Sequence, residues 1–147
     1  MNMVVNVFQY IGFILSTYEH QKKFFYRIRF PRIPPTVVSI SFYPSGLSEW
    51  FADNVNSRGE QFTFIWDDSE ETALLLQKKN NDKVKFQWQN DEEDDEDYYF
   101  EFKIQVDEIT KDVSLIVTDF AEEDELEESK MLWDNLVSDL KQVLGAS

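Results

Sequence analysis

Cysteine is absent from this 147-residue sequence, histidine occurs once, and glycine and proline occur only four times each. Without cysteine the chain has no disulfide, no thiolate nucleophile and no cysteine-ligated zinc, and we expect a cytoplasmic protein because that compartment keeps thiols reduced. His20 has neither a neighbouring cysteine nor metal-ligand spacing, so we expect no metal and no other cofactor. The isolated glycines form neither a phosphate-binding loop nor a nucleophile elbow. We therefore expect a protein that is not an enzyme.

Basic residues are also scarce, at 14 lysines and arginines against 29 aspartates and glutamates, for a net charge of −15. Such a chain repels phosphate backbones and anionic lipid surfaces, so we expect neither nucleic acid nor a membrane as a partner. A basic protein partner is electrostatically favoured instead. Aromatic residues make up 16% of the sequence, and a single domain of this length buries a full core. The rings either fill that core or line a cavity in it.

The first 18 residues carry no charged side chain and are rich in apolar ones. A secretory signal would have a basic start and a small-residue cleavage site, and a membrane span would need about 20 mostly apolar residues. Asn2, Asn6 and Gln9 interrupt the run, so we favour neither. We interpret residues 1–21 as an extension outside a domain of residues 22–147. The extension is either an accessory helix or strand docked on the domain, or the product of a start codon assigned too early.

Alternation of apolar and polar side chains predicts strands along most of the remaining chain. The pattern is clearest from Tyr98 to Val106, where Phe100, Phe102 and Ile104 alternate with polar and charged residues. The predicted strands are residues 24–30, 53–57, 62–66, 72–79, 84–88, 98–106 and 113–117. The predicted turns include residues 67–71, 80–82 and 107–112.

Helices are predicted in two places. Between the first two strands, Pro35 suits the first turn of one short helix, although β-branched residues follow it. A turn at residues 44–46 then leads into a second short helix with Trp50 and Phe51 on one side.

The long helix is amphipathic and is predicted from about Asp124 to a glycine cap at Gly145. Asp119 and Glu122 have the spacing of a capping box at its start, and acids fill its first turns, where the helix dipole stabilises them. Its apolar stripe comprises Leu126, Trp133, Leu136, Val137, Leu140, Val143 and Leu144.

Seven consecutive carboxylates, Asp91 to Asp97, lie between Trp88 and Tyr98. We interpret them as a solvated hairpin loop, where salt screens their repulsion and their charge keeps aromatic strands from pairing with other chains. The run lacks the glycine and the spaced ligands of an EF-hand, which disfavours a divalent-cation site. Together with the acids of residues 119–128, the run offers a negative surface to a basic partner.

Three stretches carry a resemblance to a known superfamily. They are PSGLSEWFADNV at 44–55, QFTFIWD at 61–67 and SLIVTDFAEEDELEESKMLWDNL at 114–136. With the order of the elements, they resemble START-like (SRPBCC) domains over residues 22–145, in particular small bacterial START-like proteins of unassigned function. More distantly, the chain resembles the branch named for activators of the heat-shock chaperone ATPase, in which a tryptophan follows the second short helix as Trp50 does here.

This resemblance implies an α+β helix-grip fold. A curved antiparallel sheet of about seven strands would carry two short helices after its first strand and a long C-terminal helix packed on it. In such domains the space between sheet and helix holds an apolar ligand in some members. The ligand-binding residues implied here are Trp50, Phe62, Phe64, Trp66, Phe86, Trp88, Phe100, Phe102 and Trp133. The alternative is that these rings fill the core, and we find no convergent polar groups on the buried faces.

These observations predict a non-catalytic START-like binding domain. Its partner would be an apolar small molecule between the sheet and the C-terminal helix, or a basic protein on the acidic surface. Two alternatives stay open. One is a co-chaperone-like regulator of an ATPase, implied by the distant branch, and the other is an enzyme that uses the cavity, as some relatives do.

Overall fold

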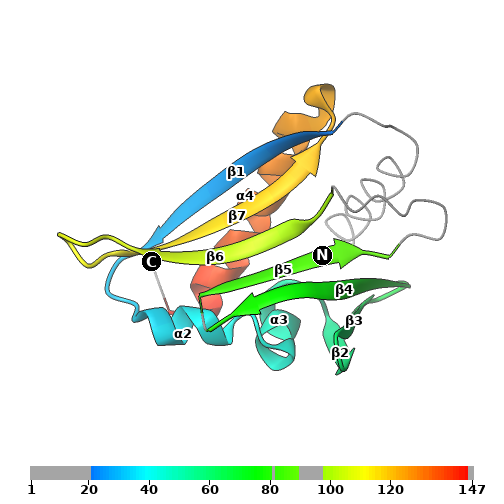
Figure 1. Ribbon diagram of the computed structural model, residues 1–147, viewed down its shortest axis with the longest axis horizontal. Helices are drawn as coiled ribbons and strands as arrows, with labels where there is room; N and C mark the ends of the chain where they lie inside the picture. Colours follow the sequence, from blue (N-terminus) through cyan, green and yellow to red (C-terminus); the bar gives the residue numbers. More distant parts are fainter. Residues whose placement is uncertain (1–20, 81, 90–97, 146–147) are drawn as a thin grey trace.

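The computed structural model describes residues 21–80, 82–89 and 98–145. In these residues seven strands form one antiparallel sheet in the order β1-β7-β6-β5-β4-β3-β2. The strands are β1 (Lys22–Phe30), β2 (Asn54–Arg58), β3 (Gln61–Trp66), β4 (Ser69–Lys79), β5 (Lys83–Trp88), β6 (Phe100–Val106) and β7 (Val113–Ala121). The helices are α2 (Pro35–Ile40), α3 (Pro44–Trp50) and α4 (Leu126–Val143). The sheet curves and α4 crosses one of its faces (Figure 1), so the predicted helix-grip fold is confirmed.

The two short helices between β1 and β2 are confirmed, but the second begins earlier than expected. The turn predicted at residues 44–46 is the first turn of α3, with Pro44 at its N-terminus. A Cβ at Gly46 would collide with the carbonyl oxygen of Ile40 and the backbone of Ser41. Glycine therefore allows α3 to lie directly against the end of α2, and this contact fixes where the end of α3 points.

The β3–β4 hairpin is tighter than its sequence predicts. The expected turn at residues 67–71 is wrong, because β4 already begins at Ser69 and Ser69 pairs with Trp66. Glu71 pairs with Phe64 in the same ladder. Directly paired residues of antiparallel strands point to the same face, so Ser69 and Glu71 join the buried rings of β3 on the inner face of the sheet.

Two predictions concern residues outside the described ranges. One is the N-terminal extension, of which residues 1–20 are not described, and the other is the loop formed by the acidic run of residues 91–97. The strands that the acidic run joins are described, and β5 and β6 pair antiparallel, as predicted. In the described part of the chain no helix is both long and apolar enough to cross a membrane.

The long C-terminal helix packs on the sheet as predicted, but its start differs. Asp119 lies in β7, so the predicted capping box is wrong. A 3-10 turn at Glu123–Glu125 leads into α4, and no side chain caps the helix. Val143, placed in the apolar stripe, is 43% exposed, whereas Trp133 and Leu140 are buried. Gly145 follows the helix with a φ of +74°, the left-handed conformation that a glycine cap provides.

Candidate functional site

The nine rings predicted to bind a ligand come together between the sheet and α4. Trp88 is half-buried and the other eight are buried. Their contacts link β3, β5, β6, α3 and α4. For example, the ring centroids of Trp88 and Phe100 are 4.9 Å apart, and Phe102 lies 5.5 Å from Trp50 and 5.7 Å from Trp133. The strand alternation therefore predicts correctly which side chains point inward.

Phe51, at the end of α3, occupies the centre of this ring cluster. Its ring centroid lies 5.1 Å from Phe64, 5.8 Å from Phe100 and 6.0 Å from Trp133, and it is 2% exposed. The sequence pattern predicts Phe51 on one side of its helix together with Trp50, but Phe51 is not among the nine residues predicted to bind a ligand. With this ring in place, the middle of the space between the sheet and α4 is filled by side chains.

The described residues leave a cavity of about 140 Å³ at one edge of the ring cluster, and this cavity is partly open to solvent. It is lined by Ser48, Glu49, Trp50, Phe51, Ala52, Asp53, Trp66 and Leu136. Two of the nine predicted residues, Trp50 and Trp66, belong to this lining. Drug-sized ligands occupy pockets of about 300–1,000 Å³, whereas a cavity of about 150 Å³ holds one benzene ring. The space therefore fits a single ring or a compact branched group.

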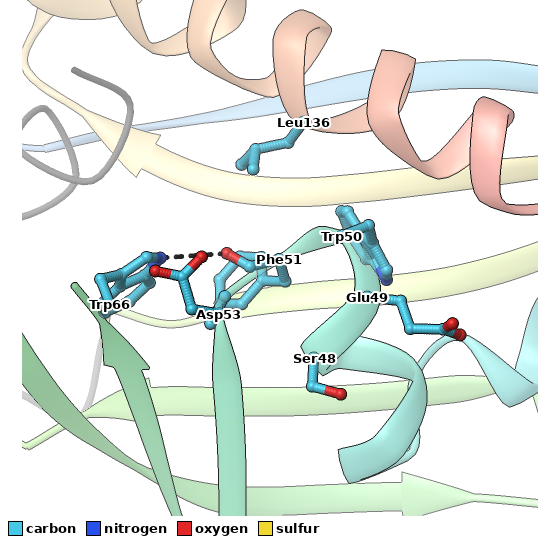
Figure 2. A pocket seen from close by; sticks show the side chains of 8 residues that line it. Ser48, Glu49, Trp50, Phe51, Asp53, Trp66 and Leu136 are labelled. Carbon is cyan, nitrogen blue, oxygen red and sulfur yellow. Dashed lines mark hydrogen bonds between the residues drawn. The ribbon is translucent and has the colours of Figure 1, made fainter. Parts of the chain in front are cut away.

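Backbone hydrogen bonds fix the two tryptophans at the cavity. Trp66 donates its indole N–H to the carbonyl oxygen of Phe51 at 3.3 Å, and Trp50 donates its own to that of Ser41 at 3.1 Å. Figure 2 shows the first of these bonds, with Leu136 reaching from α4 toward Phe51. Because both N–H groups bind the backbone, the two indoles contribute mainly carbon surface to the lining.

Carboxylates lie beside these rings. Asp53 comes from the residues between α3 and β2, and Glu49 comes from α3 itself. Burial raises the pKa of Asp53, and its hydrogen bond with Asp67 and the like charge of that residue raise it further. The eight lining residues thus include three aromatic and two acidic residues and no basic one. Both acidic side chains are exposed, and Figure 2 shows the Glu49 carboxylate turned away from Phe51 and Trp66.

A second carboxylate on the inner face was missed by the sequence analysis. Asp119 follows Val117 on the inward-pointing positions of β7 and is half-buried. It accepts hydrogen bonds from the indole N–H of Trp133 at 2.9 Å and from the backbone N–H of Phe120 at 2.8 Å. Burial raises the pKa of Asp119 to about 7, although both hydrogen bonds lower it. The inner face therefore carries a carboxylate that was not predicted there.

Further polar groups on the inner face belong to β4 and α4. Burial raises the pKa of Glu71. The hydroxyl oxygens of Ser69 and Ser129 are buried and have no hydrogen-bond partner among the described residues. In those same residues, no three aspartate, glutamate or histidine side chains lie close enough together to hold a metal ion. The alternation of side chains along β7 and β4 could have predicted that Asp119, Ser69 and Glu71 point to the inner face.

The curved sheet gripped by a long helix defines a helix-grip domain, and comparison with known proteins assigns its family. Residues 19–146 match the START-like superfamily domain, so the chain belongs to this superfamily. A protein from Bacteroides fragilis, solved by NMR, is 31% identical over 85% of this chain and 92% of its own, with a TM-score of 0.62. No functionally curated protein matches the sequence.

Two more distant structures share the fold alone. The Aha1 dimer from Colwellia psychrerythraea has a TM-score of 0.67 at 14% identity, over 84% of this chain and 96% of that one. CalU16 from Micromonospora echinospora has a TM-score of 0.64 at 15% identity, over 86% of this chain and 77% of that one. The predicted membership of the START-like superfamily is confirmed by the family match, and the Aha1 structure shares the fold.

Proposed function

We propose that this chain is a non-catalytic START-like binding domain that holds a small, largely apolar molecule in the cavity between α3, β3 and α4. The observation that carries the proposal is the incomplete packing beside Trp50, Phe51 and Trp66, in an interior that rings otherwise fill. In this assignment Trp50 and Trp66 contact the ligand directly. The other seven predicted rings form the packed wall behind Phe51.

The size of the cavity defines the ligand. A lipid chain would need several times the available volume, so the bound group is one ring or a compact branched group. Binding is favoured over catalysis because two acids near the rings already interact with other groups. Asp119 accepts two N–H bonds, and Asp53 is hydrogen-bonded to Asp67.

Filling the cavity tests the proposal. Leu136→Phe places a larger side chain in the lining, and Ala52→Val is a second variant should the first distort α4. We expect single-ring compounds such as toluene to cause chemical-shift changes in the unmodified protein, and either variant to abolish them. Met131→Phe is the matched control, since Met131 lies on α4 but is 67% exposed. Undiminished binding in both cavity variants would place the ligand elsewhere.

Binding of a basic protein on an acidic surface is a second candidate function. It is supported by the close spacing of carboxylates at the start of α4. There the side-chain hydrogen bond with Glu128, followed by burial and the charges of Glu128, Asp124 and Glu122, raises the pKa of Glu125. A cationic partner relieves the repulsion between carboxylates that are crowded in this way. Changing Glu125 and Glu128 to Gln should slow association with a basic partner and weaken its dependence on salt. An unchanged association rate would remove this candidate.

A further inference from the structure

We propose that the outer face of the sheet binds a short acidic segment of a partner protein. This face is the side of the strands opposite to the ring cluster and the cavity, so the proposal does not depend on the proposed function. Figure 1 looks onto this face, with α4 behind the strands. The position of the basic side chains, in a chain that is otherwise strongly acidic, carries this inference.

Half of the chain's basic residues lie on outward-facing positions of neighbouring strands. Side chains alternate between the two faces along a strand, so the direct neighbours of the buried rings point outward. The outward basic residues are Lys23, Arg27 and Arg29 of β1, Lys103 of β6, Lys83 and Lys85 of β5, and Lys79 of β4, seven of fourteen in the sequence. On the outward positions of β1, β5, β6 and β7 the described strands carry one acidic side chain, Glu101. The rest of the chain is therefore even more acidic than its net charge of −15 indicates.

Four of these seven residues form a row across the sheet. Lys103 pairs directly with Lys83, and Lys83 pairs directly with Lys79. On the other side of Lys103, Ile116 pairs with both Lys103 and Arg27. Lys79 and Lys103 are exposed and form no ion pair with another described residue. Like charges on directly paired positions destabilise a sheet, and an acidic segment bound along the row offsets this repulsion.

The length of the row favours a short segment over a long polyanion. Neighbouring strands are about 4.8 Å apart, so the row spans about 19 Å from β1 to β4. An extended chain rises about 3.3 Å per residue, so about six residues cover the row. Nucleic acid or an anionic membrane would extend beyond the row, where the acidic remainder of the chain repels it. A short acidic stretch of a protein meets only the basic side chains.

Aromatic side chains beside the row add an apolar contact. Phe25 lies between Lys23 and Arg27 on the outward positions of β1 and is 64% exposed. The amino group of Lys85 lies 4.0 Å from the ring centroid of Tyr99, a cation–π contact that holds this lysine close to the sheet. The face therefore combines fixed positive charge with an exposed ring, and it fits an acidic segment that includes one apolar residue.

The experiment titrates the full chain with the acetylated peptide Glu-Glu-Leu-Glu-Glu-Glu at low salt, followed by NMR. We expect chemical-shift changes on the outward residues of β1, β5 and β6, and none with the peptide in which glutamine replaces every glutamate. Lys79→Gln combined with Lys103→Gln should raise the dissociation constant at least about fivefold, without loss of stability because repelling pairs are removed. Lys130→Gln combined with Lys141→Gln, the same charge change on α4, should raise it less than about twofold. Absence of peptide binding, or equal weakening in the two double variants, would overturn the inference.

Further probes test the other occupants of this face. A thymidine hexanucleotide has as many negative charges as the peptide, and we expect it to bind more weakly. Equal or tighter binding of the hexanucleotide, or binding to phosphatidylserine vesicles through the same residues, would overturn the assignment to a protein segment. Peptide binding that appears only when serine replaces residues 91–97 would assign the face to the chain's own acidic run and would also overturn the inference.

Discussion

The two halves of the space under α4 are packed in different ways. On the side of β5 and β6, rings meet rings, and Phe86, Phe100 and Phe102 are at most 1% exposed. At the end of α3, three rings meet carboxylates and a cavity of about 140 Å³ remains. In this START-like domain the ring-packed side stabilises the fold, and the proposed binding site lies where the packing is incomplete. Phe51 touches both regions and separates them.

The largest expected effect is on the ring-packed side. Phe102 is fully buried and contacts Phe42, Trp50, Phe51 and Trp133. Phe102→Ala should lower the free energy of unfolding by about 3–5 kcal/mol, measured by urea denaturation, because it removes a large apolar side chain and leaves a void. Phe25→Ala is the control, since Phe25 is 64% exposed, and it should change stability by about 0.5 kcal/mol or less. Similar losses in the two variants would contradict a rigidly packed interior.

A smaller effect is expected from Asp119, whose carboxylate accepts a hydrogen bond from the indole N–H of Trp133 on the packed side. The folded chain raises the pKa of Asp119 from 3.8 to about 7, so between these values it holds a proton that the unfolded chain has lost. The stability contribution of the protonated form is complete below pH 3.8 and lost as the pH rises to about 7. Stability should therefore fall with rising pH, with a slope of at most about 1.4 kcal/mol per pH unit.

Asp119→Asn should flatten this slope, because asparagine keeps an acceptor for the indole N–H of Trp133 but does not titrate. Denaturation curves recorded at intervals from pH 4 to pH 8 measure it. Burial also raises the pKa of Glu71, so Glu71→Gln provides a comparison and should flatten the slope less. A wild-type protein that gains stability across this range would contradict the assignment of a protonated Asp119.

Local patterns predicted the strands well because alternation is a property of a few neighbouring residues. Phe100, Phe102 and Ile104 are inward-facing, as their spacing requires. Local patterns gave the wrong prediction for Asp119, which was placed in a capping box. The acids that follow it are compatible both with the start of a helix and with the end of a strand. Whether a chain turns at Asp119 or continues to Ala121 depends on pairing with β1, whose residues lie far away in sequence.

The cavity was not predictable for a related reason. The direction in which Phe51 points depends on how α3 packs against β2 and α4, and on the close approach that Gly46 allows. Asp53 and Asp67 are brought together by the pairing of β2 with β3, which places their adjoining ends side by side. Sequence spacing indicates which rings are buried, but it does not indicate where buried rings fail to fill the space.

The smallest expected effect concerns the carboxylates at the cavity. Asp67→Asn removes the like charge next to Asp53, so the pKa of Asp53 should fall, while the contribution of burial remains. Both side chains are exposed, and we expect stability to change by no more than about 0.5 kcal/mol. A carbonyl-detected NMR titration of Asp53 measures the change directly, with Asp68→Asn as a control in the same hairpin turn. An unchanged titration would show that the two carboxylates do not interact, and the electrostatic difference between the cavity and the ring-packed side would then depend on Glu49 and Asp53 alone.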